Sequence, residues 1–318
     1  MYDARDRNHR ILCTLRPAGV PVPESFGTDT TAVPTPGPGQ FLSRTLYLSI
    51  DSAIRLNSGD VVGGETVAQI LESRHPDHRP GEFVVVRNGW QQFALSSGQG
   101  VRRLDPDSAP ISTALGVLGL PGLLGYTGLI YCGEPRPGQT VLVSDPTGPA
   151  GSTAGQAARI VGARAVGIAS SPEKCEYAVN QLDFTACVGA ADEISGACPD
   201  GVDVYFDTVG GGILAKALEC LAPHARVVLG GMSETYSAGL SLAPLLSSRA
   251  TVQGIFVEDH LERLPELGKV VGRWIRAGLF RYREDMTEGL ASAPAAFCRL
   301  MSGESFGKVL VRVAPEHL

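Results

Sequence analysis

Residues 141–152 constrain the fold of this chain more than any other segment. They begin with a short apolar run, continue through a turn that contains Gly148 and Gly151, and lead into a helix of small residues predicted at 152–161. A parallel-sheet protein holds a dinucleotide pyrophosphate with this order of elements, because the turn brings the backbone close and the helix start directs N–H groups at the anion. The segment therefore predicts an α/β fold with a doubly wound parallel sheet.

The same turn departs from the G-x-G-x-x-G pattern of dinucleotide sites. Pro146 occupies the first glycine position, and only Gly148 and Gly151 obey the pattern. Asp145 adds a negative charge near the expected phosphates, and Pro149 lacks an N–H donor. The sequence predicts the fold and leaves open whether the turn still binds a nucleotide.

Strand and helix patterns alternate after residue 140. Strands are predicted at 141–144, 165–169, 186–188, 202–207, 226–230 and 251–257, and further helices at 172–182, 213–221 and 261–277. Such alternation indicates a parallel sheet with helices on both faces.

The first third of the chain has a different pattern of predicted elements. Short strand candidates, such as residues 41–50 and 83–87, are separated by turns rich in glycine and proline, which is consistent with a small barrel. The strand predicted at 308–313 could return to this region. We therefore expect two domains, residues 1–117 completed by 284–318, and residues 118–283.

Composition excludes several classes of protein. The 318 residues are 43% hydrophobic and 19% charged, which is typical of a globular chain. A net charge of −6 and the lack of basic runs argue against nucleic-acid binding. The seven cysteines include no C-x-x-C pair, which argues against a disulfide framework or a structural zinc site and favours a reducing cytoplasm.

One uncharged stretch, residues 108–133, is long enough to span a bilayer. It contains several glycines and Pro121, and no basic cluster flanks it. We expect buried helices at a domain junction rather than a membrane span. The polar, charged N-terminus does not match a secretory signal.

Several separated motifs together resemble the zinc-independent medium-chain dehydrogenase/reductases, and within them the prostaglandin reductase or alkenal double-bond reductase branch. The motifs lie at residues 45–51, 115–122, 172–174, 203–211, 282–285 and 306–308. The resemblance implies a GroES-like substrate domain built from both chain ends and a central Rossmann domain. It also implies NADPH as hydride donor, an α,β-unsaturated carbonyl compound as acceptor, no metal, and a homodimer.

The end of the second predicted strand argues for NADP(H). An NAD site usually has an acidic residue there, whereas Ser170, Ser171 and Lys174 offer two hydroxyls and an ammonium, which suit a 2′-phosphate. Lys174 matches the lysine with that role in the family; without the resemblance, an ordinary solvated helix lysine is the simpler interpretation.

Other cofactor contacts are partly replaced. Gly148, Ala150, Gly151 and Ser152 still offer N–H donors at the helix start. Thr208 and Ser305 stand where the family has asparagines, and each keeps a hydroxyl. Ala190 stands where the family has a tyrosine at the adenosine end, and it cannot stack.

In the substrate region the resemblance points to four residues. Ala53 replaces a family tyrosine, which leaves more room, and Arg55 is retained, either for substrate or for a structural salt bridge. Tyr126 matches a family tyrosine beside the nicotinamide, and Tyr236 lies near a substrate-facing one. Either tyrosine could donate a proton or a hydrogen bond to an enolate oxygen, or be a half-buried aromatic with a satisfied hydroxyl.

The leading hypothesis is NADPH-dependent reduction of a conjugated double bond, with reductive cyclisation of a larger metabolite as a variant. The altered turn motivates an alternative, a non-redox cyclase or isomerase with a degenerate or absent cofactor site. A binding or sensing protein that uses the nucleotide domain without chemistry is the third.

Overall fold

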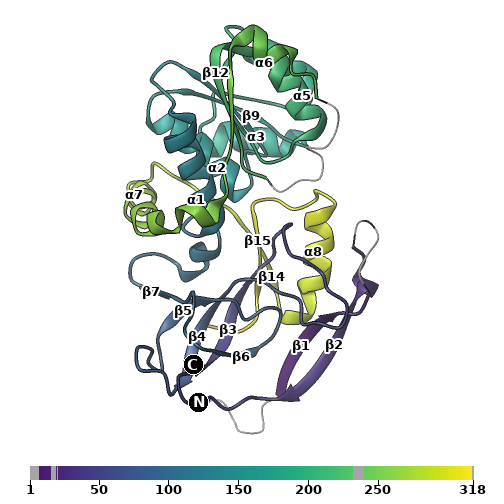
Figure 1. Cartoon of the computed structure of the whole chain (residues 1–318), viewed down its shortest axis with the longest axis vertical. Helices are drawn as coiled ribbons and strands as arrows, with labels where there is room; N and C mark the ends of the chain where they lie inside the picture. Colours follow the sequence, from purple (N-terminus) through teal and green to yellow (C-terminus); the bar gives the residue numbers. More distant parts are fainter. Residues whose placement is uncertain (1–6, 16–18, 20, 232–239, 317–318) are drawn as a thin grey trace. The chain divides into compact units, whose positions relative to one another are not determined.

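The structure is a computed structural model that describes residues 7–15, 19, 21–231 and 240–316 (Figure 1). Its contacts divide the chain into unit 1, Met1–Leu115 with Glu284–Leu318, and unit 2, Gly116–Arg283. Unit 2 contains a parallel sheet and unit 1 is rich in antiparallel strands, so the predicted fold class is confirmed.

Unit 2 is built on a six-stranded parallel sheet with the order β10-β9-β8-β11-β12-β13. The strands are β8 (Thr140–Ser144), β9 (Arg164–Ile168), β10 (Ala186–Val188), β11 (Val202–Asp207), β12 (Leu221–Leu229) and β13 (Thr251–Gly254). The chain winds outward from β8 to β10, then returns to β11 on the other side of β8. This is the Rossmann order, and its ligand crevice lies at the carboxyl ends of β8 and β11, where the winding direction reverses.

Helix α1 precedes the first strand of unit 2, and the other helices follow its strands. They are α1 (Leu120–Thr127), α2 (Pro149–Ile160), α3 (Pro172–Leu182), α4 (Ile194–Ala197), α5 (Gly211–Glu219), α6 (Ala243–Ser248) and α7 (Leu264–Arg276). Helix α2 lies close to the sheet because its inward side chains are small: Ala154, Ala157 and Ala158 are fully buried. At Gly155, a Cβ would lie 1.9 Å from the Phe184 ring.

Four predicted boundaries in unit 2 are wrong by at least three residues, and one of them is the end of the strand predicted at 251–257, which ends at Gly254. Helix α2 begins at Pro149 rather than at 152, since proline is favoured at the first helical position, where no N–H is needed. Strand β12 begins five residues before the predicted 226. The helix predicted from 261 begins at Leu264 and follows a 3₁₀ segment, Val257–Arg263.

Unit 1 contains a seven-stranded sheet in which β14-β15-β3-β4-β5-β7 are neighbours and β6 pairs with β3. Its strands are β3 (Phe41–Ser49), β4 (Thr66–Ser73), β5 (Phe83–Val86), β6 (Phe93–Ser96), β7 (Arg102–Leu104), β14 (Glu284–Glu288) and β15 (Lys308–Arg312). Strand β15 pairs antiparallel with β3, so the final strand returns to the first domain. A second sheet pairs β1 (Arg7–Cys13) with β2 (Phe26–Ala32), and α8 (Ala293–Met301) packs in the same unit.

Residues 108–133 form short helical segments rather than one long helix. They are a 3₁₀ helix (Ile111–Leu115), α1, and a π-helical segment (Gly128–Gly133). Among the residues that the structure describes, no helix is long and apolar enough to cross a membrane.

An ion pair between a buried lysine and a half-buried aspartate joins two of the family motifs within unit 1. The Lys308 ammonium, 4% exposed, contacts the Asp51 carboxylate and donates to the Ile50 carbonyl oxygen at 3.2 Å. Asp51 also accepts from the Ser49 hydroxyl. These contacts anchor the start of the loop that carries Ala53 and Arg55.

We expect Asp51→Asn to lower the free energy of unfolding by about 2 kcal/mol, because it removes the carboxylate that contacts the buried Lys308 ammonium. Urea-induced unfolding measures the change. Glu288→Gln is the matched control, since the Arg312–Glu288 pair is exposed on the adjacent strands and should contribute at most about 0.5 kcal/mol. Equal effects of the two variants would contradict the expectation.

Candidate functional site

The turn after β8 reverses the chain at Asp145, whose φ of 48° lies in the left-handed region. The Gly148 N–H donates to the Asp145 carbonyl oxygen at 3.2 Å, and the Ser152 N–H donates to the Gly148 carbonyl oxygen at 2.8 Å as the first bond of α2. Aspartate tolerates a positive φ better than most residues. The turn therefore forms without a glycine at position 146.

Two backbone N–H groups at the start of α2, those of Ala150 and Gly151, have no hydrogen-bond acceptor among the described residues, and we call them the open amides. No side chain caps the helix. Because Pro149 occupies the first helical position, its missing N–H removes a donor that the helix would leave unpaired anyway. The open amides and the positive end of the helix dipole together suit an anion.

A close backbone contact requires glycine at position 151. A Cβ on Gly151 would lie 2.1 Å from the Asp145 carbonyl oxygen, which cannot move aside. A Cβ on Gly148 would lie 2.2 Å from Asp145 Oδ2, a contact that rotation of the Asp145 side chain could relieve.

The predicted 2′-phosphate residues lie together at the carboxyl end of β9. Ser171 is the N-cap of α3, and its Oγ accepts from the Lys174 N–H at 3.3 Å. The Lys174 ammonium donates to Ser170 Oγ at 3.2 Å. Two hydroxyls and one ammonium therefore converge on one solvent-accessible corner of unit 2.

Asp145 is the acidic group of this region. Its side chain has an open side to solvent, yet desolvation by the surrounding loop raises its pKa, against the opposing effects of the Lys174 charge and of hydrogen bonds from Gly148 and Thr147. When ionised, this carboxyl group would repel an anion bound at the start of α2.

Thr208 follows β11, on the other side of the crevice. Its N–H donates to Ser144 Oγ at 2.8 Å, which ties the ends of β8 and β11 together. Asp207 accepts from the N–H groups of Val209 and Gly210, so its carboxylate shapes the turn.

The Tyr126 hydroxyl is directed at α7. It donates to Glu266 Oε1 at 2.8 Å, and the Tyr131 hydroxyl donates to the same oxygen at 2.6 Å. Arg263 contacts Glu266 Oε2 at 3.3 Å and lies 3.8 Å above the Tyr131 ring. Tyr126 is 5% exposed, and burial followed by the Glu266 contact raises its pKa, so the phenol stays protonated.

Glu266 keeps its negative charge in this cluster. Desolvation raises its pKa, but hydrogen bonds from Tyr131, Tyr126 and Arg263 outweigh that effect and hold the pKa below its ordinary value. Sequence reasoning missed Glu266, and the only signal was its place in the first turn of an amphipathic helix.

The remaining predicted site residues belong to unit 1, to the segment after β10, or to the residues that the structure does not describe. Tyr236 falls outside the described residues. Ala53 and Arg55 are exposed in unit 1, and Arg55 has no ion-pair partner among the described residues, so the structure offers no salt bridge for it. Ser305 is buried in unit 1 just before β15, and Ala190 is exposed after β10.

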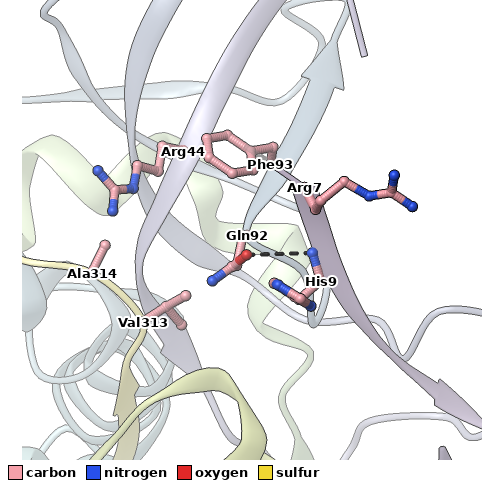
Figure 2. A pocket seen from close by; sticks show the side chains of 7 residues that line it. All are labelled: Arg7, His9, Arg44, Gln92, Phe93, Val313 and Ala314. Carbon is pink, nitrogen blue, oxygen red and sulfur yellow. Dashed lines mark hydrogen bonds between the residues drawn. The ribbon is translucent and has the colours of Figure 1, made fainter. Parts of the chain in front are cut away.

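A cavity of about 230 Å³ in unit 1 is not lined by any predicted site residue. Arg7, His9, Arg44 and Gln92 contribute to its wall. Figure 2 shows the guanidinium groups of Arg7 and Arg44 pointing away from each other, and the His9 N–H donating to Gln92 Oε1. The two charges do not converge on one anion, and the cavity is not a candidate site for the predicted chemistry.

Two family models match the chain. One, described as an N-terminal domain of oxidoreductase, matches residues 9–104, and one, described as a zinc-binding dehydrogenase, matches residues 149–271. Among the described residues, no three or more His, Cys, Asp or Glu side chains gather in a group that could hold a metal ion.

Similar proteins cover nearly the whole chain. The NADPH-dependent curcumin reductase of Escherichia coli is 37% identical over 99% of this chain and 99% of that protein. Prostaglandin reductase 1 of Oryctolagus cuniculus is 33% identical over 91% and 89%, respectively. The crystal structure of CurA from Vibrio vulnificus in complex with NADPH has a TM-score of 0.90 and 33% identity, and covers 96% of this chain and 99% of that one.

We expect Tyr126→Phe to lower the free energy of unfolding by about 1–2 kcal/mol, because a buried hydroxyl loses its bond to a charged acceptor. Tyr131→Phe is the matched control: it removes a bond to the same carboxylate oxygen, but Tyr131 is 38% exposed, so the loss should be smaller. Urea-induced unfolding of both variants measures the difference. An unchanged stability of Tyr126→Phe would contradict the assigned contact.

Proposed function

This chain belongs to the zinc-independent medium-chain dehydrogenase/reductases, and we propose that it is an NADPH-dependent reductase that acts on the conjugated double bond of an α,β-unsaturated carbonyl compound. The similar proteins named for curcumin and prostaglandin reduction support this assignment. The observation that carries it is the pair of open amides at the start of α2, beside the corner formed by Ser170, Ser171 and Lys174.

The residues at the ends of β8 and β9 fit the cofactor. The Ala150 and Gly151 N–H groups suit the pyrophosphate, Gly148 and Gly151 permit the close backbone, and Ser152 continues the helix start. When bound, NADPH supplies the hydride that reduces the β-carbon. The chain contributes binding, orientation and stabilisation of charge.

Selection between NADPH and NADH follows from charge. No acidic side chain occupies residues 169–172, after β9, where an NAD enzyme usually binds the ribose hydroxyls. The Lys174 ammonium and the two serine hydroxyls instead offer one positive charge and three donors to a phosphate dianion.

On the substrate side, we propose that Arg55 and the space left by Ala53 accommodate the conjugated substrate. Negative charge develops on its carbonyl oxygen during reduction, and a fixed hydrogen-bond donor stabilises it. Tyr236 and Tyr126 are the proposed donors. Tyr126 can serve only after its hydroxyl leaves Glu266, which makes Tyr236 the first choice.

The alternative of a non-redox enzyme rested on the altered turn. This alternative has less support because Pro149 occupies the first helical position and leaves the Ala150 and Gly151 amides open.

Thr208 and Ser305 remain proposed cofactor contacts through their hydroxyls. We further propose a homodimer in the cytoplasm, as the family resemblance and the cysteine usage suggest.

We expect Lys174→Ala to raise the KM for NADPH about 10- to 100-fold, which corresponds to losing one charge-assisted hydrogen bond of about 1.5–3 kcal/mol. The KM for NADH should change by less than about twofold. Steady-state assays with a simple enone and each cofactor measure both. Lys216→Ala, an exposed lysine of the same unit paired with Glu219 and Asp192, is the control. Equal losses for both cofactors, or no NADPH consumption by the wild type, would contradict the proposal.

We expect Asp145→Asn to lower the Kd for NADP⁺ by about fivefold, since removing roughly 1 kcal/mol of repulsion strengthens anion binding. Asparagine tolerates the positive φ, so the turn is retained. Because the pKa of Asp145 is raised, the wild type should gain affinity as the pH falls toward that pKa, and the variant should lack this gain. Fluorescence titration at several pH values tests it; weaker binding by the variant would contradict it.

A further inference from the structure

Two thiols of unit 2 lie within contact of each other. The Cys187 thiol donates to Cys175 Sγ at an Sγ–Sγ distance of 2.8 Å. Cys175 lies in the first turns of α3 and Cys187 in the middle of β10 (α3 is labelled in Figure 1). Both are half-buried free thiols. A disulfide needs the sulfurs at about 2.05 Å, so a shift of less than about 1 Å would bring them to bonding distance.

The pair lies beside the proposed cofactor site. Cys175 follows Lys174 directly, and its N–H donates to the carbonyl oxygen of the N-cap residue Ser171 at 3.1 Å. On the other side, a Cβ added to Gly167 would meet Pro146 Cγ at 2.8 Å and Cys187 Sγ at 3.1 Å. Cys187 Sγ and Pro146, a residue of the turn that follows β8, therefore both lie against Gly167.

We propose that Cys175 and Cys187 form a reversible intrachain disulfide when the chain meets a low-molecular-weight disulfide such as oxidised glutathione. A contacting pair of accessible thiols is the arrangement of redox-sensing disulfides in reducing compartments. The oxidant is a soluble disulfide, so no metal and no electron carrier from the enzyme is required.

The two sulfurs have different roles in forming the disulfide. Burial, together with the contact to Cys175, raises the pKa of Cys187, so Cys175 is the first nucleophile. Cys175 first releases its proton to solvent, and the resulting thiolate attacks one sulfur of oxidised glutathione. The S–S bond of the oxidant breaks, and one glutathione leaves as a thiolate that takes up a proton. Cys187 then gives up its proton, its sulfur attacks Cys175 Sγ, and the second glutathione leaves. Two protein thiols are oxidised and one glutathione disulfide is reduced to two thiols.

This bond would affect cofactor binding, an inference that rests on the proposed function. Joining Cys175 to β10 restrains the turn of α3 that presents Ser171 and Lys174. We expect the KM for NADPH to rise at least about threefold on oxidation, with kcat at saturating NADPH unchanged, because the reacting end of the site is untouched.

Mass spectrometry tests the pair directly. The full-length wild-type protein is incubated with oxidised glutathione, and we expect the intact mass to fall by two hydrogens and non-reducing peptide mapping to join the peptides of Cys175 and Cys187. Dithiothreitol should reverse both changes. Glutathione adducts on either cysteine without a link, or reaction of other cysteines alone, would overturn the proposal.

Variants supply the controls. Cys175→Ser and Cys187→Ser should each lose the link, whereas Cys132→Ser, a half-buried cysteine of the same unit, should keep it. The mass readout does not depend on catalysis. A link with an unchanged KM would overturn only the effect on NADPH, whereas a reduced protein that consumes no NADPH would overturn the proposed function and leave the disulfide standing.

Discussion

The close approach of helix α2 to the end of strand β8 determines how the proposed cofactor site of unit 2 is built. Gly151 has no Cβ because the Asp145 carbonyl oxygen occupies that space, and Gly125 of α1 has none because the Ala150 carbonyl oxygen occupies it. The first turn of α2 is thus held on one side by the turn and on the other by α1. The Ala150 and Gly151 amides consequently have fixed directions before any ligand binds, which reduces the ordering cost of binding an anion.

Prolines in this turn change its chemistry less than the sequence pattern indicates. Compared with the G-x-G-x-x-G pattern, Pro146 replaces a glycine and Pro149 removes an N–H donor. The helix begins at Pro149, and at that position proline supplies the helical φ without sacrificing a hydrogen bond. Pro146 instead packs against Gly167, the residue that also makes room for Cys187. The remaining departure is electrostatic: Asp145 brings a carboxyl group into the turn that precedes the open amides.

Much of the fold could be predicted because its signals are local. The apolar runs of β8, β10 and β11, and the serine and proline at the start of α3, mark those elements in the sequence. The contacts that could not be predicted join residues distant in sequence: Tyr126 with Glu266, Lys308 with Asp51, and Cys175 with Cys187. Each depends on how separate elements pack, which periodicity does not encode. The same limit explains why Tyr126 could be matched to a family position while the direction of its hydroxyl could not.

We propose that the Ala150 and Gly151 amides bind the pyrophosphate of the cofactor. Titration of the ¹⁵N-labelled full-length protein with NADP⁺, with the backbone amide resonances assigned, tests this contact. We expect these two resonances to shift together with that of Lys174 and to saturate at one common concentration. Resonances of unit 2 that shift elsewhere while Ala150 and Gly151 stay in place, or a spectrum that NADP⁺ leaves unchanged, would contradict it.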